Sequence, residues 1–234
     1  MIKPDLIVVW PIAYDYPIFR ELIADNRNLF GKVIISFAHN CVERDYRQFL
    51  KNTHTDFTFV ESMADKHWYD DAISIALDEV KSKWVMFMEQ DFVCDRKFLV
   101  ELLKKASDYH FVSLREDQRF HFGCFVAKMK YIKATHRYFG HIPDAHLDCF
   151  GLFVAELILM SMGKYAALGE LKLEGYKHLS GLTHNYTLMS DGEPAVGGAE
   201  ALASLKEYNE RCIHAKVLQN TQWIELLKKF NSTL

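Results

Sequence analysis

As far as residue 106, the chain alternates short apolar runs with segments whose apolar positions recur every three or four residues. The runs are rich in β-branched and aromatic residues, which strands favour, and they lie at residues 6–10, 32–37, 57–60 and 84–88. The segments with helical spacing lie at residues 16–30, 43–50, 69–80 and 96–106. Strands that are apolar almost throughout are buried on both faces, so this alternation predicts an α/β fold in which helices flank a mostly parallel sheet.

The second half of the chain has a different pattern. Residues 111–114 and 122–132 are strand-like, with no long helix between them. A loop rich in Gly, Pro and His, "FGHIPDAHLDCFG", leads to a predicted helix at residues 152–162. A Gly-rich linker then precedes an amphipathic helical tail from residue 200 to about residue 230, which we expect to pack on its own domain.

The composition is that of an ordinary globular protein, 50% hydrophobic and 25% charged. The formal net charge of -3 excludes a global basic field that would attract nucleic acid or acidic membranes, although a local basic groove stays open. The five cysteines are widely spread and form no Cys-x-x-Cys pair, which indicates reduced thiols. The apolar run near the amino terminus is too short for a signal peptide and no segment is long enough for a bilayer span, so we expect a cytoplasmic protein.

Three familiar motifs are missing from the sequence. It contains no Gly-x-x-x-x-Gly-Lys-Ser/Thr loop, no Gly-x-Gly-x-x-Gly after the first predicted strand and no Gly-x-Ser-x-Gly elbow. These absences weigh against a P-loop hydrolase, a Rossmann dehydrogenase and an α/β-hydrolase.

Two carboxylates follow the most apolar predicted strand, "WVMFM", in the sequence Glu89-Gln90-Asp91. Alternate side chains of an extended strand point the same way, so Glu89 and Asp91 can face one point beyond the sheet. Ligands of parallel α/β sheets bind beyond the carboxyl ends of the strands, and two carboxylates there suit Mg²⁺ or Mn²⁺. The alternative is that both acids are solvated strand-end residues, while Asp95 caps the helix at residues 96–106.

The segment "ADKHWYDDAISIALDEVKSKWVMFMEQDFVCDRKFLVELL" resembles the donor-binding half of family-2-like glycosyltransferases of the GT-A fold, in which an apolar strand leads to an Asp-x-Asp motif. The segment "FVAKMKYIKATHRYFGHIPDAHLDCFGLFVAELILMSMGKYAAL" resembles the acceptor half, and "KHLSGLTHNY" resembles the region that carries a metal-binding His. The resemblance covers roughly residues 5–190. The chain departs from the family in two places, because the motif is Glu-Gln-Asp and the second strand ends in "SFAHN" without acidic residues.

The resemblance implies a Rossmann-like central sheet, a small acceptor-side sheet and a C-terminal helical tail. A single GT-A domain would span residues 1–198, with a donor half at 1–95 and an acceptor half at 96–198, and residues 199–234 would form a helical extension.

The resemblance also implies a metal-dependent glycosyltransferase that moves a sugar from a nucleotide-sugar donor to an acceptor hydroxyl. Asp91, helped by Glu89 and His184, would hold Mn²⁺ or Mg²⁺, and His184 is preferred to His178. The cation would neutralise charge that develops on the diphosphate leaving group. A simple structural role, such as a bond to a backbone carbonyl, is the alternative for His184.

Asp148 matches the position of the family's catalytic acid, and in an inverting transfer it would take the proton of the acceptor hydroxyl. Asp144 is the reserve candidate. Asp148 also precedes the predicted helix at residues 152–162, so a capping role stays open.

Contacts to the nucleotide-sugar are expected from residues at the ends of the first, third and fourth βα units. Trp10 or Tyr14 would stack on the base, and Asp65, Asp70 or Asp71 would hold the base or ribose, although Asp70 and Asp71 equally suit the first turn of a helix. The full set of expected donor contacts is Trp10, Pro11, Tyr14, Asp65, Asp71 and Gln90.

Several alternatives remain open at this stage. The acceptor would be a saccharide, a glycoconjugate or a modified DNA base as in some phage-encoded transferases, for which "KKASDYH", "KMKYIK" and "THRYFGH" offer local positive charge. The loop "REDQRFHFG" carries Arg115, Arg119 and His121, which suit either an anionic acceptor or an exposed turn. A catalytically inactive binding or scaffold module and, less favoured, a nucleotidyltransferase are the competing functions.

Overall fold

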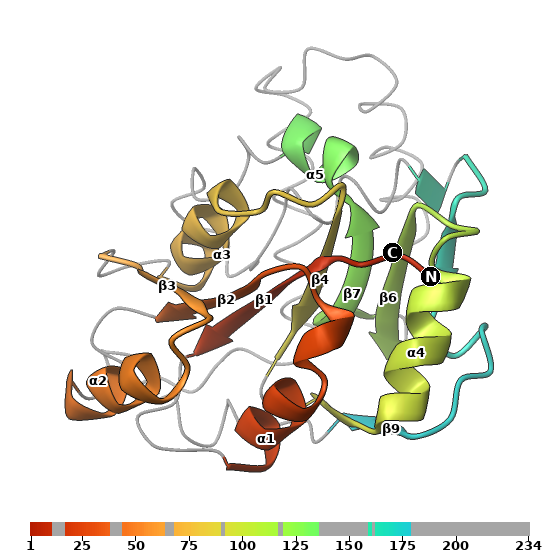
Figure 1. Cartoon of the computed structure of the whole chain (residues 1–234). Helices are drawn as coiled ribbons and strands as arrows, with labels where there is room; N and C mark the ends of the chain where they lie inside the picture. The colour runs from red at the N-terminus through yellow and green to blue at the C-terminus, as the bar shows by residue number, and fades with distance from the viewer. Residues whose placement is uncertain are drawn as a thin grey trace.

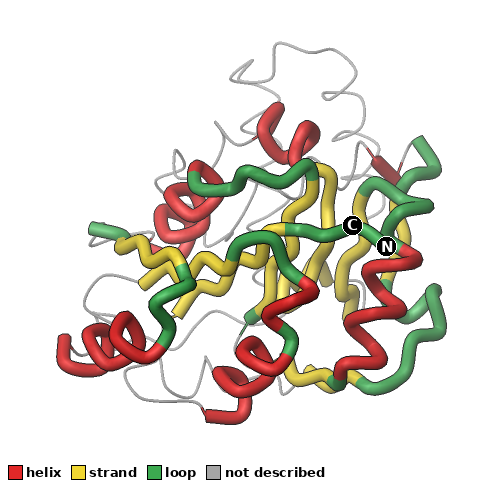
Figure 2. Tube along the Cα trace, viewed as in Figure 1, coloured by secondary structure: helices red, strands yellow, loops and turns green. Residues whose placement is uncertain are grey.

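In the computed structural model of this chain, the residues described are 1–10, 17–37, 44–63, 68–89, 92–116, 119–135, 159–160 and 162–178. Helices flank a central sheet in this part of the chain (Figures 1 and 2). The strands are β1 (Asp5–Trp10), β2 (Val33–Phe37), β3 (Thr58–Glu61), β4 (Trp84–Met88), β5 (Phe92–Cys94), β6 (Phe111–Glu116), β7 (Arg119–Lys128), β8 (Tyr165–Ala167) and β9 (Tyr176–His178). The helices are α1 (Pro17–Asp25), the short 3-10 helix η1 (Arg27–Leu29), α2 (Arg44–Thr53), α3 (Trp68–Asp78), α4 (Arg96–Lys105) and α5 (Met129–Thr135).

The central sheet has seven strands in the order β3-β2-β1-β4-β7-β6-β8. The strands β3, β2, β1 and β4 are parallel, while β7 runs antiparallel to both β4 and β6. A second, two-stranded sheet pairs β5 with β9. The predicted α/β class, the mostly parallel sheet and the small second sheet are therefore confirmed.

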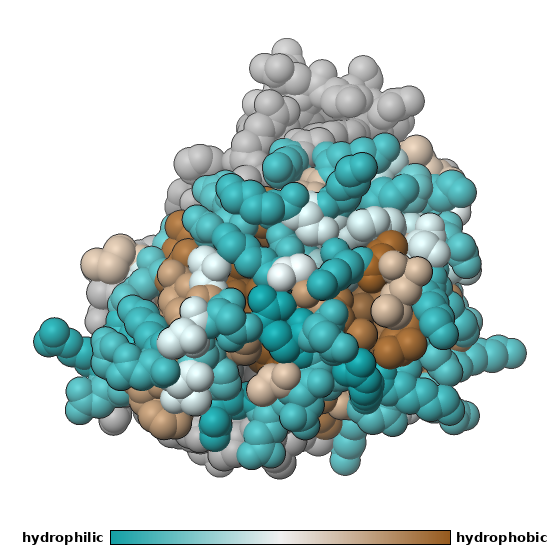
Figure 3. Space-filling view, viewed as in Figure 1, coloured by the Kyte–Doolittle hydropathy of each residue, from teal (hydrophilic) through white to brown (hydrophobic). Residues whose placement is uncertain are grey.

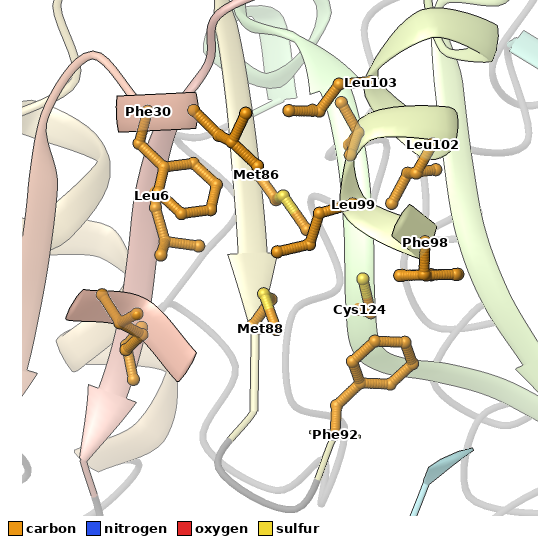
Figure 4. Packing of buried hydrophobic residues seen from close by; sticks show 14 of the residues in the cluster. Leu6, Phe30, Met86, Met88, Phe92, Phe98, Leu99, Leu102, Leu103 and Cys124 are labelled. Atoms are coloured by element: carbon orange, nitrogen blue, oxygen red, sulfur yellow. The ribbon is translucent and has the colours of Figure 1, made fainter. Parts of the chain in front are cut away.

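Both faces of the central sheet are buried, as the apolar strands predict. In β1, Leu6 and Val8 belong to the cluster that faces α4, and Ile7 and Val9 belong to the cluster that faces α3. Figure 4 shows Leu99, Leu102 and Leu103 of α4 packed on this side of the sheet, with Met86 and Met88 of β4 among them. Because successive side chains of a strand point to opposite faces, each strand contributes to two hydrophobic clusters, one on each face of the sheet.

A buried carboxylate fixes the amino ends of three strands at one level. Asp5, 3% exposed, accepts the backbone N–H of Lys32 through Oδ1 at 2.8 Å. Its Oδ2 accepts the N–H groups of Lys81 and Ser82 at 2.7 and 2.8 Å. A Cβ at Gly31 would lie 2.5 Å from Asp5 Oδ1, so a residue larger than glycine does not fit where the chain passes this carboxylate. The starts of β1, β2 and β4 are thereby tied together.

Three predicted elements differ from those in the structure. The predicted helix at residues 16–30 ends at Asp25, where Asn26 Nδ2 donates to the Leu22 carbonyl at 2.9 Å and a 3-10 turn follows. The predicted strand at 122–132 was wrong in its second part, because α5 begins at Met129. Met129 and Ile132 are both buried, a spacing of three that suits a helix. The expected "REDQRFHFG" loop is instead largely the β6–β7 hairpin.

Other predictions fall outside the described residues. Of the predicted helix at 152–162, residues 159, 160 and 162 are described; residues 159–160 are helical and Met162 lies in a turn, so the helix has ended by that residue. The tail from residue 200 is not among the described residues. The division into a donor half, an acceptor half and a C-terminal extension stays a prediction. Within the described ranges, no helix has the length and apolar character needed to cross a membrane.

Candidate active site

The carboxyl ends of the parallel strands lie side by side at one edge of the sheet. Trp10 at the end of β1 pairs with Phe37 of β2, and Phe37 pairs with Glu61 of β3. Glu89 follows β4 directly at the same edge. Ligands of this sheet type bind beyond these ends, so Glu89 lies where a ligand of such a sheet is expected.

The backbone groups of Glu89 form hydrogen bonds with two other strands, β7 and β5. Its N–H donates to the Gly123 carbonyl of β7 at 2.8 Å, and its carbonyl accepts the Phe92 N–H at 3.1 Å. The Glu89 side chain is half-buried. The structure therefore confirms the predicted place of Glu89 at the strand end, and it fixes the backbone on either side of Gln90 and Asp91, which themselves lie outside the described residues.

The small sheet brings a distant part of the chain to this motif. His178, the last residue of β9, pairs with Phe92, the residue that follows Asp91 in the sequence. The Asp95 N–H donates to the Gly175 carbonyl at 2.8 Å and extends the pairing into the start of α4.

Three aromatic rings stabilise this pairing. Phe92 stacks on Tyr176 with centroids 5.5 Å apart, and Phe98 of α4 lies 4.9 Å from Tyr176 and 5.7 Å from Phe92. The segment "KHLSGLTHNY" thus begins beside the acidic motif. The side chain of His178 and all of His184 lie outside what the structure describes.

The start of α3 is anchored at the carboxyl ends of β2 and β3. Ser62 Oγ, just after β3, donates to Asp71 Oδ2 at 2.5 Å, and the buried Ser36 Oγ donates to the Ala72 carbonyl at 2.8 Å. Arg47 of α2 forms an ion pair with Glu61. The structure therefore brings Asp71 to the predicted edge, next to Ser62. Sequence reasoning missed Ser62 and Arg47. Ser62 lies two residues after the predicted strand at 57–60 and Arg47 lies inside the predicted helix at 43–50, so neither position carried a clear signal.

Trp10 does not have the surroundings expected of a base-stacking residue. Its side chain is 1% exposed and belongs to the hydrophobic cluster between the sheet and α4. This burial gives the indole a packing role and argues against a contact with the base.

The remaining predicted site residues lie outside the described part of the chain. They are Pro11, Tyr14, Asp65, Gln90, Asp91, Asp144, Asp148 and His184. The backbone of Asp70 lies in α3, but its side chain is not described. Within the described ranges, no three His, Cys, Asp or Glu side chains are close enough to hold a metal ion.

The two described cysteines are poor nucleophiles. Burial, followed by the nearby Asp95 carboxylate, raises the pKa of Cys94 to about 12. Burial also raises the pKa of Cys124 well above its ordinary value. Because the thiolate is the reactive form, neither residue supports cysteine catalysis at neutral pH.

The chain matches no family model and no curated protein, but solved structures match it over most of its length. Glucosyl-3-phosphoglycerate synthase from Mycobacterium tuberculosis, in complex with Mn2+, UDP and phosphoglyceric acid, has a TM-score of 0.56 and 10% identity, over 88% of this chain and 78% of that chain. TarS 1-349 from S. aureus, in complex with UDP-GlcNAc, has a TM-score of 0.56 and 12% identity, over 98% of this chain and 71% of that chain. At this identity the likeness establishes the fold, and the chain has the GT-A fold predicted from its sequence.

Proposed function

We propose that this protein is a metal-dependent glycosyltransferase that moves a sugar from a nucleotide-sugar donor to an acceptor hydroxyl. One observation carries the proposal. In a GT-A fold, Glu89 lies at the carboxyl end of β4, and the β5–β9 pairing sets the start of the histidine-containing segment beside the residue after Asp91. If Glu89 and Asp91 were only solvated residues at the end of a strand, no β9 strand paired with β5 beside them would be needed.

Asp91, Glu89 and His184 are the proposed metal-binding residues. Two carboxylates and an imidazole are suitable ligands for Mn²⁺, and Mg²⁺ is the alternative with stronger preference for oxygen. The similar synthase from M. tuberculosis binds Mn2+ together with UDP. When bound, the cation would offset the negative charge of the diphosphate leaving group.

Asp71, Asp65, Pro11, Tyr14 and Gln90 are the proposed donor contacts. For Asp71 the support is its place at the strand ends. Its Oδ2 accepts the Ser62 hydroxyl, and that bond orients the carboxylate at this edge. A carboxylate held in this way suits the hydroxyl groups of a ribose, which donate hydrogen bonds.

Asp148 is the proposed base of an inverting transfer, with Asp144 in reserve. A carboxylate there would take the proton of the acceptor hydroxyl as that hydroxyl attacks the sugar. The proposed acceptor is a saccharide or glycoconjugate, and a modified DNA base is the second choice.

Turnover of a panel of nucleotide-sugars, measured as released nucleoside diphosphate with Mn²⁺, Mg²⁺ or EDTA, tests the proposal. We expect metal-dependent release from one donor. Asp148→Asn should retain donor binding and lose transfer by a factor of about 100 or more, the size of a typical general-base contribution, while Asp144→Asn serves as the matched control.

Wild-type turnover in Asp148→Asn, with loss in Asp144→Asn, would transfer the role of base to Asp144. Metal-dependent donor binding without any release of diphosphate would instead favour an inactive binding module.

A further inference from the structure

A group of lysines lies at the sheet edge opposite the candidate active site. It consists of Lys83, Lys128, Lys130, Lys133 and Lys164, here called the lysine face. Lys83 precedes β4, Lys128 ends the antiparallel β7, α5 carries Lys130 and Lys133, and Lys164 precedes β8. All five therefore lie at the end of the sheet where β4, β6 and β8 begin or on α5 beside it, in the upper part of Figure 1.

Backbone hydrogen bonds hold this edge together around His110. The Met129 N–H donates to the Lys83 carbonyl at 2.9 Å, and the Lys128 N–H donates to the His110 carbonyl at 2.9 Å. The His110 N–H donates to the Lys164 carbonyl at 2.6 Å. Burial is the main cause that lowers the pKa of His110, and the charges of Lys128, Lys130 and Lys164 lower it further, so these three cations lie near one imidazole.

No ion pair within the described part of the chain involves a lysine of this face. The described residues form the ion pairs Arg27–Asp56, Lys32–Glu79 and Arg47–Glu61. Four of the five lysines are exposed, and Lys128 is half-buried. Figure 3 shows mainly hydrophilic residues in the region where Figure 1 places α5.

Aromatic rings orient two of the lysines without cancelling their charge. Lys128 Nζ lies 5.3 Å from the centroid of the Trp84 ring, and Lys130 Nζ lies 4.5 Å from that of Tyr131. Such contacts are attractive but leave the ammonium positive. The edge is therefore built to present positive charge.

Two exposed apolar side chains flank Lys164. Met160 is 37% exposed and Met162 is 53% exposed. The Gly163 N–H donates to the Met160 carbonyl at 3.0 Å, and the Lys164 N–H donates to the Leu159 carbonyl at 2.8 Å. Leu159 is fully buried, so it anchors the methionines beside the lysine face.

We propose that the lysine face, together with Met160 and Met162, docks this protein on an anionic lipid surface. Lysines attract a diffuse layer of anionic headgroups as point charges, and apolar side chains at their margin enter the boundary between headgroups and acyl chains. The whole chain carries a formal charge of -3, so such a surface would attract the lysine face locally and not the chain as a whole.

Nucleic acid fits the same face less well for two reasons. The described cations of this face are lysines, which act as compact point charges, whereas the planar fork of arginine recognises phosphates and bases bidentately. Moreover, Trp84 and Met88 lie at opposite ends of β4, roughly 13 Å apart for four steps of a strand. A nucleic acid on the lysine face would lie away from the candidate active site, whereas a lipid surface would leave that site open to solution.

Co-sedimentation of the full chain with vesicles tests the proposal without any substrate. We expect binding to vesicles of phosphatidylcholine mixed with phosphatidylserine, no binding to phosphatidylcholine alone, and release at high salt. Each lysine near an anionic surface contributes about fivefold to partitioning, so the triple change Lys130→Glu, Lys133→Glu and Lys164→Glu should lower it about a hundredfold or more. The double change Met160→Ser and Met162→Ser should lower partitioning onto the vesicles about tenfold, because two side chains would lose their partial burial in the lipid.

The matched control changes three exposed lysines elsewhere, Lys51→Glu, Lys97→Glu and Lys172→Glu, and alters the net charge by the same amount. It should retain binding. Absence of wild-type binding, or equal loss in both triple variants, would overturn the proposal. Binding of duplex DNA but not vesicles, lost only in the lysine-face variant, would also overturn it and assign the face to nucleic acid. Melting temperatures near that of the wild type would show that each variant is folded.

Discussion

Gly175 joins the small β5–β9 sheet to the start of α4, and its replacement should be unusually costly. Its φ of +87° is in the left-handed region. Its carbonyl accepts the Asp95 N–H, and a Cβ there would overlap the Asp95 carboxylate, at 2.7 Å from both Cγ and Oδ1. That carboxylate caps α4 by accepting the Phe98 N–H at 2.7 Å. Gly175→Ala therefore strains the backbone and displaces a helix cap together.

The expected loss of unfolding free energy is the sum of two parts. The left-handed conformation costs a non-glycine residue about 1–2 kcal/mol. Loss of an Asp cap costs about 1 kcal/mol. We expect Gly175→Ala to lower the unfolding free energy by about 2–3 kcal/mol. Gly163→Ala, with a φ of +62° but nothing within 4 Å of its Cβ, should lose only the first part.

Urea denaturation of wild type, Gly175→Ala and Gly163→Ala measures this difference. In an Asp95→Ala background, the extra cost of Gly175→Ala should disappear, because the two residues then no longer collide. Equal losses for the two glycine variants, or an unchanged cost in the Asp95→Ala background, would refute the reasoning.

Two further predictions concern stability at the opposite edge of the sheet. Asp5→Asn replaces one of two carboxylate oxygens that together accept three backbone N–H groups, so we expect urea denaturation to show an unfolding free energy lower by about 2 kcal/mol. The change Asp25→Asn at an exposed position is the control. Equal effects of the two changes would contradict the role of Asp5. His110 has a lowered pKa in the folded state, so the unfolded chain binds its proton more tightly, and stability should fall as the pH drops from about 6.5, the ordinary pKa, through the folded value. His110→Asn should remove that part of the pH dependence of the melting temperature, and an unchanged profile would show that His110 is not its source.

The first half of the fold was predictable because its signals are local. Apolar strands and helix-period segments follow each other directly, and Asp95 caps α4 as its position before "RKFLVELL" indicates. The parallel direction of β3, β2, β1 and β4 follows from the same alternation, whereas their order in the sheet is known only from the structure. Glu89 could be assigned to the strand end for the same reason.

Features that depend on distant contacts could not be predicted from these patterns. The pairing of Phe92 with His178 joins short strands far apart in the sequence, and neither strand is long enough to give a clear period. The sequence locates Trp10 at the end of a strand but does not indicate that a hydrophobic cluster covers it. Likewise, "SFAHN" lacks the family's acids, and in the structure Ser36 is buried with its hydroxyl donated to α3.

A thermal-shift experiment tests whether the protein binds a nucleotide at the end of β4 in a metal-dependent way. Wild type and Asp91→Asn would be heated with UDP, GDP, CMP or dTDP sugars, with and without Mn²⁺. A ligand at about 100 times its dissociation constant stabilises the folded protein by about 2.7 kcal/mol, or roughly 5–11 °C for a chain of this size. We expect such a shift with one nucleotide, only with Mn²⁺ and only in the wild type. The same Mn²⁺-dependent shift in Asp91→Asn, or no shift with any donor, would contradict metal-dependent binding at this site.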